Sequence, residues 1–176
     1  MKFEETQTYK NLQKALTGEA TAHLKYQFYQ KQLSEFNKGY DNILSEIIHN
    51  EKEHGKIWFK TLHGNTIPDN ETNLIDAIAG ETYEANEMYI EFGKIAKEEG
   101  YTDIADLFNK VASIEKHHSQ IFHKIKTEIS TDIYDSIEQT DWKCLNCGYR
   151  VTGFNAPNTC PVCKHPQKYF TKQEEE

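Results

Sequence analysis

Two short stretches of the chain place a glutamate and a histidine three residues apart on an otherwise apolar helix face. They are HNEKEHGKIW, with Glu51 and His54, and SIEKHHSQIF, with Glu115 and His118. Side chains three residues apart are neighbours on a helix. Because an unpaired buried carboxylate costs several kcal/mol, comparable to the stability of a whole small domain, each acid needs a partner. The nature of that partner constrains the fold.

Apolar residues recur at spacings of three and four in four segments, and acidic residues or histidines interrupt each of them. The segments run from about 12 to 33, 44 to 58, 78 to 95 and 104 to 129. NKGYD, GNTIPDN and EEGYTD separate them. This pattern predicts four helices packed as an antiparallel bundle.

The two halves of the helical region resemble each other. KALTGEATA aligns with DAIAGETYE, so each half has a Gly-Glu pair, at Glu19 and Glu81, followed on the next helix by Glu-x-x-His. The intervals between the two glutamates of each half are 32 and 34 residues. One position breaks the symmetry, because Glu84 of the second half aligns with Ala22 of the first. The second half therefore has an additional carboxylate.

Metal cations are the partners that fit these acids best. No lysine or arginine lies on the apolar faces near them, which disfavours buried ion pairs. One glutamate from each of two helices, and Glu-x-x-His from each of two others, bind a pair of metal ions in known helical bundles. The candidate ligands are Glu19, Glu51, His54, Glu81, Glu84, Glu115 and His118.

All four cysteines lie near the C-terminus in two Cys-x-x-Cys pairs, Cys144 with Cys147 and Cys160 with Cys163. Two such pairs make a tetrahedral thiolate site for zinc or iron. The spacing alone favours a structural zinc, but a redox-active di-metal site in the same chain needs electrons, which favours iron. Five aromatic residues are expected to shield this centre: Trp142, Tyr149, Phe154, Tyr169 and Phe170. A partly helical linker is expected over residues 131–140.

The composition argues against several classes of partner. The net charge is −8 and the 20 basic residues form no stripe, so a nucleic-acid partner is not expected. The chain has no signal-peptide pattern and no apolar run of membrane-spanning length. We therefore expect a cytoplasmic protein without a membrane partner, where clustered cysteines favour metal over disulfides.

From Tyr9 to Phe170 the sequence resembles the rubrerythrin family. The motifs, in order, are GEATA…KY, NEKEH, GETYEANEMYIEF, EEGY, EKHH and WKCLNCGY…CPVCKHPQKYF. The resemblance implies an all-α ferritin-like four-helix bundle with two irons in residues 1–135. It also implies a small C-terminal rubredoxin-like domain in residues 136–176 with one iron on its four cysteines. Zinc can replace iron by substitution.

The resemblance also implies how the ligands are divided. The two glutamates of the Glu-x-x-His pairs, here Glu51 and Glu115, would bridge the irons. Glu19 would bind one iron terminally, and Glu81 with His118 would bind the other.

Four residues would take part in catalysis by the same resemblance. Glu84 matches a ligand that binds the first iron in the oxidised state and yields to His54 on reduction. Tyr26 and Tyr89 match tyrosines that hydrogen-bond to the ligand carboxylates, as metal ligands usually require.

The family implies a peroxidase of anaerobes or microaerophiles that reduces hydrogen peroxide to water and defends against oxidative stress. Electrons would pass from a nicotinamide-dependent reductase or a rubredoxin through the cysteine-bound iron. At least a homodimer is expected, because electron transfer needs the two centres close together.

Two alternatives remain open at this point. A ferroxidase or iron-storage protein would use the same ligands, although it has no need of the cysteine module. A non-catalytic zinc-ribbon protein would have no use for Glu84. The sequence also departs from the family in ATAHLKY, where an arginine-containing run is usual, and in the late Gly-Tyr of the first connection, which indicates a shifted loop.

Overall fold

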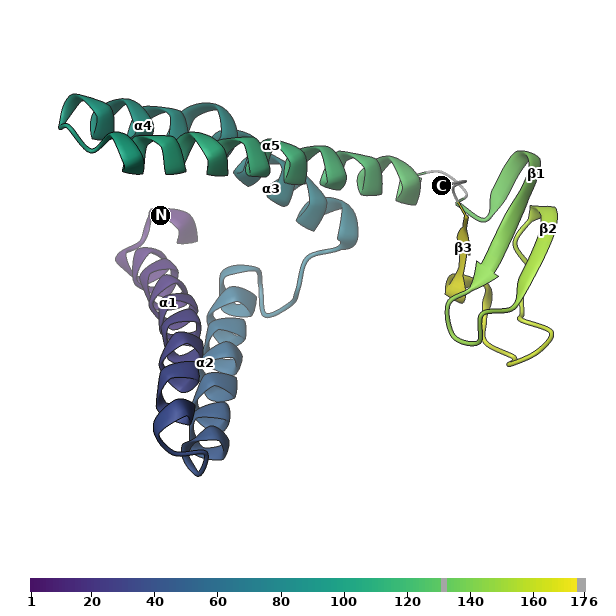
Figure 1. Ribbon diagram of the computed structural model, residues 1–176, viewed down its shortest axis with the longest axis horizontal. Helices are drawn as coiled ribbons and strands as arrows, with labels where there is room; N and C mark the ends of the chain where they lie inside the picture. The colour runs from purple at the N-terminus through teal and green to yellow at the C-terminus, as the bar shows by residue number, and fades with distance from the viewer. Residues whose placement is uncertain (131–132, 174–176) are drawn as a thin grey trace. The chain divides into compact units, whose positions relative to one another are not determined.

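The computed structural model of the protein, which describes residues 1–130 and 133–173, is helical up to Ser130, and a small sheet follows (Figure 1). This confirms the predicted class, a helical region with a small four-cysteine domain after it. The chain divides between Asp69 and Asn70 into two compact units.

None of the described helices has both the length and the apolar composition needed to cross a membrane. The helical elements are η1 (Phe3–Glu5), α1 (Gln7–Phe36), α2 (Tyr40–Leu62), α3 (Asn70–Tyr83), the π-helical η2 (Glu84–Met88), α4 (Tyr89–Glu98) and α5 (Thr102–Ser130). The helices form four long segments, because α3, η2 and α4 follow one another without a break.

Helices α1 and α2 lie side by side as a hairpin, which we call the first half (Figure 1). They approach closely at Gly55, where an added Cβ atom would lie 3.7 Å from the Cβ of Glu19 and 3.8 Å from Leu16. Ile48 is buried between the helices, and its carbonyl oxygen lies 2.9 Å from Nδ1 of His23. This contact joins the side chain of His23, one turn beyond Glu19 on α1, to the backbone of α2.

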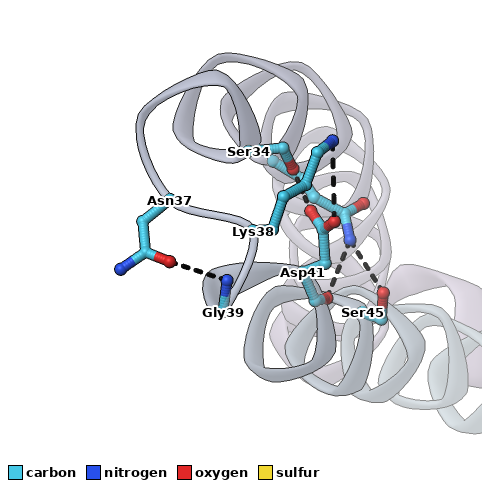
Figure 2. A network of polar contacts seen from close by, with 7 residues as sticks. Ser34, Asn37, Lys38, Gly39, Asp41 and Ser45 are labelled. Atoms are coloured by element: carbon cyan, nitrogen blue, oxygen red, sulfur yellow. Dashed lines mark hydrogen bonds and ion pairs between the residues drawn. The ribbon is translucent and has the colours of Figure 1, made fainter.

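The turn between α1 and α2 closes without a left-handed residue (Figure 2). Asn37 is extended, with φ −153°, and Gly39 is in the right-handed helical region, with φ −61°. The N–H of Gly39 donates to the side-chain oxygen of Asn37 at 2.8 Å. Ser34 donates to the carboxylate of Asp41, which also pairs with Lys38 at 4.0 Å. Side chains therefore hold this loop together.

The turn between α4 and α5 uses glycine in a different way. Gly100 has φ +90°, and its N–H donates to the carbonyl oxygen of Lys97 at 3.2 Å. The N–H of Tyr101 donates to Ala96 at 2.8 Å, which completes a Schellman ending for α4. The late Gly-Tyr of the first connection thus reflects a different way of ending the preceding helix.

Helices α3 and α4, joined by η2, lie along α5 and form the second half (Figure 1). The contact between α4 and α5 uses small buried residues, among them Gly93 and Ala105. A Cβ atom on Gly93 would lie 3.1 Å from Oδ1 of Asn109 and 3.4 Å from the carbonyl oxygen of Ala105. Phe92 packs beside this contact against Phe108, with ring centroids 5.6 Å apart.

The C-terminal domain is a three-stranded antiparallel sheet in the order β2–β1–β3. Its elements are β1 (Asp135–Cys144), β2 (Arg150–Asn155), η3 (Gln167–Tyr169) and β3 (Phe170–Lys172). The partly helical linker predicted for residues 131–140 is wrong from Asp135 onward, where the chain pairs as strand, while residues 131 and 132 lie outside the described part. The predicted domain boundary after residue 135 falls within β1, whose first residue is Asp135, and it stays a prediction.

The core of this domain is built on the cysteines. The buried residues are Trp142, Cys144, Ala156, Cys160 and Phe170, and Tyr149 and Tyr169 pack against them. Four of the five predicted shielding aromatics are therefore in place. The prediction that Phe154 also shields the cysteines is wrong, because this residue on β2 is 52% exposed.

The two helix turns predict different responses to alanine. Gly100→Ala should lower the free energy of unfolding by about 1–2 kcal/mol, because a left-handed conformation is strained for a residue with a Cβ atom. Gly39→Ala should change it by less than about 0.5 kcal/mol, since its φ is open to alanine and only the Asn37 side chain has to move. Urea unfolding followed by circular dichroism measures both, and equal losses would contradict this account.

Candidate metal centres

The first half brings together Glu19 from α1 and Glu51 and His54 from α2. One ligand atom from each of these residues lies within 4.8 Å of the others. Nδ1 of His54 is 3.3 Å from Oε2 of Glu51 and 3.6 Å from Oε2 of Glu19. The two carboxylate side chains are only 24% and 18% exposed, whereas the imidazole is half exposed. The Glu-x-x-His spacing on α2 and the close approach at Gly55 produce this cluster.

The second half repeats the arrangement with Glu81 from α3 and Glu115 and His118 from α5. Nδ1 of His118 is 2.7 Å from Oε2 of Glu115 and 3.5 Å from Oε2 of Glu81. The structure therefore groups six of the predicted ligands, in two sets of three, as the duplicated sequence indicated.

The two sets differ in their acidity. A hydrogen bond from Glu51, with smaller contributions from Trp58 and the neighbouring imidazole, lowers the pKa of Glu19 below its ordinary value. Burial, a hydrogen bond to Glu115 and the negative charge of Glu115 raise the pKa of Glu81. In each half, two carboxylates lie close enough to share a proton, and a metal cation can take the place of that proton.

The donor set suits iron or a similar ion. Carboxylate oxygens with imidazole nitrogens bind iron and manganese well, and bundles use this combination for metal pairs. Within residues 1–130 and 133–173, the ion pairs of these four glutamates are with His54 or His118 and not with lysine or arginine. The residues of each cluster therefore fit a metal ion of this kind.

Glu84, the carboxylate without a counterpart in the first half, is half-buried at the first residue of η2 and lies outside the three-residue cluster of its half. Tyr89 lies near it. Burial, followed by the negative charges of Glu84, Glu115 and Glu81, raises the pKa of Tyr89. The ring of Tyr89 packs against Phe108, with centroids 5.9 Å apart. Burial and the negative charge of these carboxylates thus make the hydroxyl of Tyr89 harder to ionise.

The π-helical segment explains how Tyr89 reaches this position. Tyr26 follows Glu19 by seven residues, but Tyr89 follows Glu81 by eight. One extra residue in an α-helix would turn the tyrosine by about 100°. The N–H of Tyr89 instead bonds to the carbonyl oxygen of Glu84, five residues back, so the extra residue is accommodated within one wide turn. The unequal spacing was visible in the sequence but was not used there.

Tyr26, the corresponding tyrosine of the first half, is half-buried on α1. Its ring lies 5.9 Å from that of Tyr29. Within the described residues, neither Tyr26 nor Tyr89 hydrogen-bonds to a carboxylate, so the predicted bonds to ligands stay a prediction.

Sequence reasoning missed two polar contacts beside the clusters. Nε1 of Trp58 donates to Oε1 of Glu19 at 3.4 Å in the first half. In the second half, the hydroxyls of Thr82 and the buried Ser119 lie 2.9 Å apart. Trp58 follows His54 by four residues, so the sequence places both on the same helix face. Its place on the apolar face did not predict a hydrogen bond from its N–H group.

The four cysteine sulfurs of the C-terminal domain lie within 4.8 Å of one another. The sulfurs of Cys144 and Cys163 are 3.7 Å apart, as are those of Cys147 and Cys160. Cys144 and Cys160 are buried, whereas Cys147 is exposed. The predicted four-cysteine site is therefore formed, with one sulfur near the surface.

The two chelating loops have the same backbone geometry. The N–H of Gly148, with φ +75°, donates to the carbonyl oxygen of Cys144 at 2.8 Å. Lys164, with φ +62°, donates to Cys160 at 3.0 Å in the same way. In each loop a left-handed residue follows the second cysteine and directs later N–H groups toward the sulfurs.

The thiols ionise unequally. A hydrogen bond from the backbone N–H of His165, strengthened by neighbouring side chains, lowers the pKa of Cys163 to about 5. The backbone N–H of Tyr149 favours the thiolate of Cys147, but partial desolvation and the other three sulfurs outweigh it and raise the pKa of Cys147 to about 12. Cys163 therefore loses its proton more readily than Cys147, whose proton a bound metal ion would have to displace.

Comparisons with known proteins agree with both centres. The family model described as "Rubrerythrin" matches residues 10–126, and that described as "Rubrerythrin, rubredoxin-like domain" matches residues 142–171. The chain is 35% identical to Rubrerythrin-1 of Clostridium acetobutylicum, with 94% of this chain and 93% of that protein covered. It is 35% identical, with the same coverage, to rubrerythrin of Nitratidesulfovibrio vulgaris. A solved structure of fully reduced, all-ferrous nigerythrin is 26% identical, covering 96% of this chain and 87% of that one, with a TM-score of 0.36.

Removing the metal from the cysteine site should unfold the C-terminal domain alone. Its core contains Trp142 packed with Cys144 and Cys160, and without metal the four thiols lose the ion that holds them together. In a Trp58→Phe chain, which leaves Trp142 as the single tryptophan, a chelator should shift the fluorescence to longer wavelength while the helical circular dichroism persists. Added Zn²⁺ should reverse the shift. An unchanged emission from chain proven free of metal would contradict the prediction.

Proposed function

The chain belongs to the rubrerythrin family, and from this premise we propose that it is a non-haem di-iron peroxidase that reduces hydrogen peroxide to water in defence against oxidative stress. The observation that carries the proposal is the presence, in one chain, of two carboxylate–imidazole clusters and a four-cysteine site. The clusters have the ligands for a redox-active metal pair, and the cysteines have those for a one-electron iron centre.

The two clusters together are proposed to hold two irons, and the four cysteines a third, with zinc as a possible substitute. The irons supply the two electrons that, with two protons, convert one hydrogen peroxide into two water molecules. The protein's own task is to bind the ions, keep the peroxide close to them and provide protons. The proposed iron ligands are Glu19, Glu51, His54, Glu81, Glu84, Glu115, His118, Cys144, Cys147, Cys160 and Cys163.

Glu84 and His54 are proposed to alternate as ligands. An anionic carboxylate stabilises the more highly charged oxidised metal, whereas a neutral imidazole suits the reduced one. Tyr89 supports this exchange, because a hydroxyl that keeps its proton near three carboxylates can donate a hydrogen bond to whichever oxygen is released. Tyr26 is proposed to serve the first half in the same way.

The four-cysteine site is proposed to receive electrons singly from outside the chain. The exposure of Cys147 supports this proposal, since an external donor can approach this side of the site. The proposed donor is a nicotinamide-dependent reductase or a rubredoxin. We propose a homodimer as the working state, in which the cysteine site and the di-iron site come within electron-transfer distance.

A metal analysis with a visible spectrum tests the function. Chain reconstituted anaerobically with iron should hold two irons in the helical region and one on its cysteines. Its red colour should bleach with a reductant and return with hydrogen peroxide. If ferrous iron is oxidised by oxygen but peroxide leaves the reduced chain unchanged, the protein is a ferroxidase. A colourless chain that takes up only zinc after reconstitution would rule out both enzymes.

The role of Glu84 predicts a specific kinetic loss. Glu84→Ala should lower kcat/KM for hydrogen peroxide by about 10- to 100-fold, the usual effect of removing a group that tunes a metal site. Iron content should stay unchanged, because the other ligands remain. Glu87→Ala, which removes an exposed carboxylate from the same π-helical segment, should match the wild type. Equal losses in the two variants would contradict a special role for Glu84.

A further inference from the structure

We propose that Trp58 is a positioning residue that holds one oxygen of Glu19 and thereby makes the metal position of the first half different from that of the second. The inference rests on the proposed function, since it assumes that Glu19 is a metal ligand. It goes beyond that function by giving a role to a residue that is not itself a ligand.

The two oxygens of Glu19 have different partners. Nε1 of Trp58 donates to Oε1 at 3.4 Å, whereas Oε2 faces Nδ1 of His54 at 3.6 Å. The indole contact is longer than the roughly 2.7–3.2 Å of an ordinary N–H···O bond, and such contacts around reactive sites often shorten when the site is filled. Oε1 of Glu19 thus accepts a hydrogen bond from the indole N–H, whereas Oε2 faces the other residues of the cluster.

The surroundings hold this contact in place. Trp58 and Glu19 are both half-buried, and they come from α2 and α1, which are in contact near Gly55. A Cβ atom at Gly55 would be in van der Waals contact with the Cβ of Glu19, so Glu19 lies close to α2, within reach of an indole one turn further along that helix. The same contact contributes, after the hydrogen bond from Glu51, to the lowered pKa of Glu19.

In the part of the chain that the structure describes, no indole N–H bonds to Glu81 in the second half. Phe122 takes the corresponding position, since it follows Glu115 by seven residues, as Trp58 follows Glu51. A phenyl ring has no N–H group, so it leaves both oxygens of Glu81 available to the cluster. The duplicated sequence therefore contains an internal control, the same ligand arrangement with and without a hydrogen-bond donor.

A donor on the non-ligating oxygen of a carboxylate has known effects. It fixes the orientation of the carboxylate and favours binding through one oxygen, and its removal typically costs about 10- to 100-fold in metal affinity or activity. With Oε1 held by Trp58, Glu19 would bind through Oε2 alone, while Glu81 keeps the choice of one oxygen or two. Trp58 thus determines which of two similar metal positions is the more rigid.

Three variants of the full-length chain distinguish the effect of the indole N–H group from the effect of the aromatic ring. Trp58→Phe keeps an aromatic ring but removes the N–H, and Trp58→Gln keeps an N–H but removes the ring. Phe122→Leu is the matched control, because it removes a ring from the corresponding position without removing a donor. Mn²⁺ is the probe, since it prefers carboxylate and imidazole ligands to thiolates, and Zn²⁺ fills the cysteine site beforehand.

The wild-type chain should bind two Mn²⁺ ions, measured by electron paramagnetic resonance and calorimetry. Trp58→Phe should weaken one of the two sites by about 10-fold, and Trp58→Gln should restore most of the loss. Phe122→Leu should leave both dissociation constants within about 3-fold, well below the effect expected for a lost donor. Wild-type affinity in Trp58→Phe, or equal losses in Trp58→Phe and Phe122→Leu, would overturn the proposal and leave the proposed function intact. A wild-type chain that takes up no Mn²⁺ would overturn both.

A spectroscopic signature tests the contact directly. The chain has two tryptophans, so its spectrum of ¹⁵N-labelled indole has two N–H signals. In chain whose cysteine site already holds Zn²⁺, further diamagnetic Zn²⁺ that fills the carboxylate clusters should move the Trp58 signal downfield as its bond to Glu19 shortens. The Trp142 signal should stay in place, because its N–H donates to the carbonyl oxygen of Gly153 at 3.0 Å in the other domain. An unmoved Trp58 signal in metal-loaded chain would overturn the proposal.

Discussion

The constraint on which both candidate metal clusters depend is that two carboxylates lie close together on half-buried helix faces. In both halves a glutamate from one helix lies beside the glutamate and histidine of a Glu-x-x-His pair on its neighbour. Mutual repulsion and the loss of water both oppose this arrangement, so it needs close helix packing and a compensating positive charge. Gly55 provides the close packing in the first half. A bound cation provides the charge far better than a shared proton can.

The helical region and the composition of its clusters could be predicted because helix periodicity is regular. Residues three, four or seven apart share a face, so the spacing of Glu51 and His54 was enough to place them together. The duplication then predicted the second cluster around Glu115 and His118. The cysteine site was equally predictable, since two Cys-x-x-Cys loops leave few other arrangements.

Features that break periodicity, or that depend on a single atom, could not be predicted in the same way. The π-helical turn changes the register of Tyr89 without changing its residue type. The strand that begins at Asp135 depends on pairing with β2 and β3, which are distant in sequence. Phe154 was assigned to the shield by type, but the alternation of side chains along β2 leaves it at the surface. The strand depends on pairing with other segments, whereas the π turn and the exposed face of β2 depend on local backbone geometry that residue type alone does not reveal.

The wide turn at Glu84 has a consequence for how such a chain can change over time. A one-residue insertion in a regular helix rotates every later side chain by about 100°, which would disrupt the packing of Phe92 and Phe108 in a single step. A π turn confines that rotation to the insertion itself, so the rest of α4 keeps its contacts. A single inserted codon can therefore alter the chemistry of one repeat at little cost to folding. Duplicated halves of this kind can therefore acquire different functions while each keeps the same helix packing.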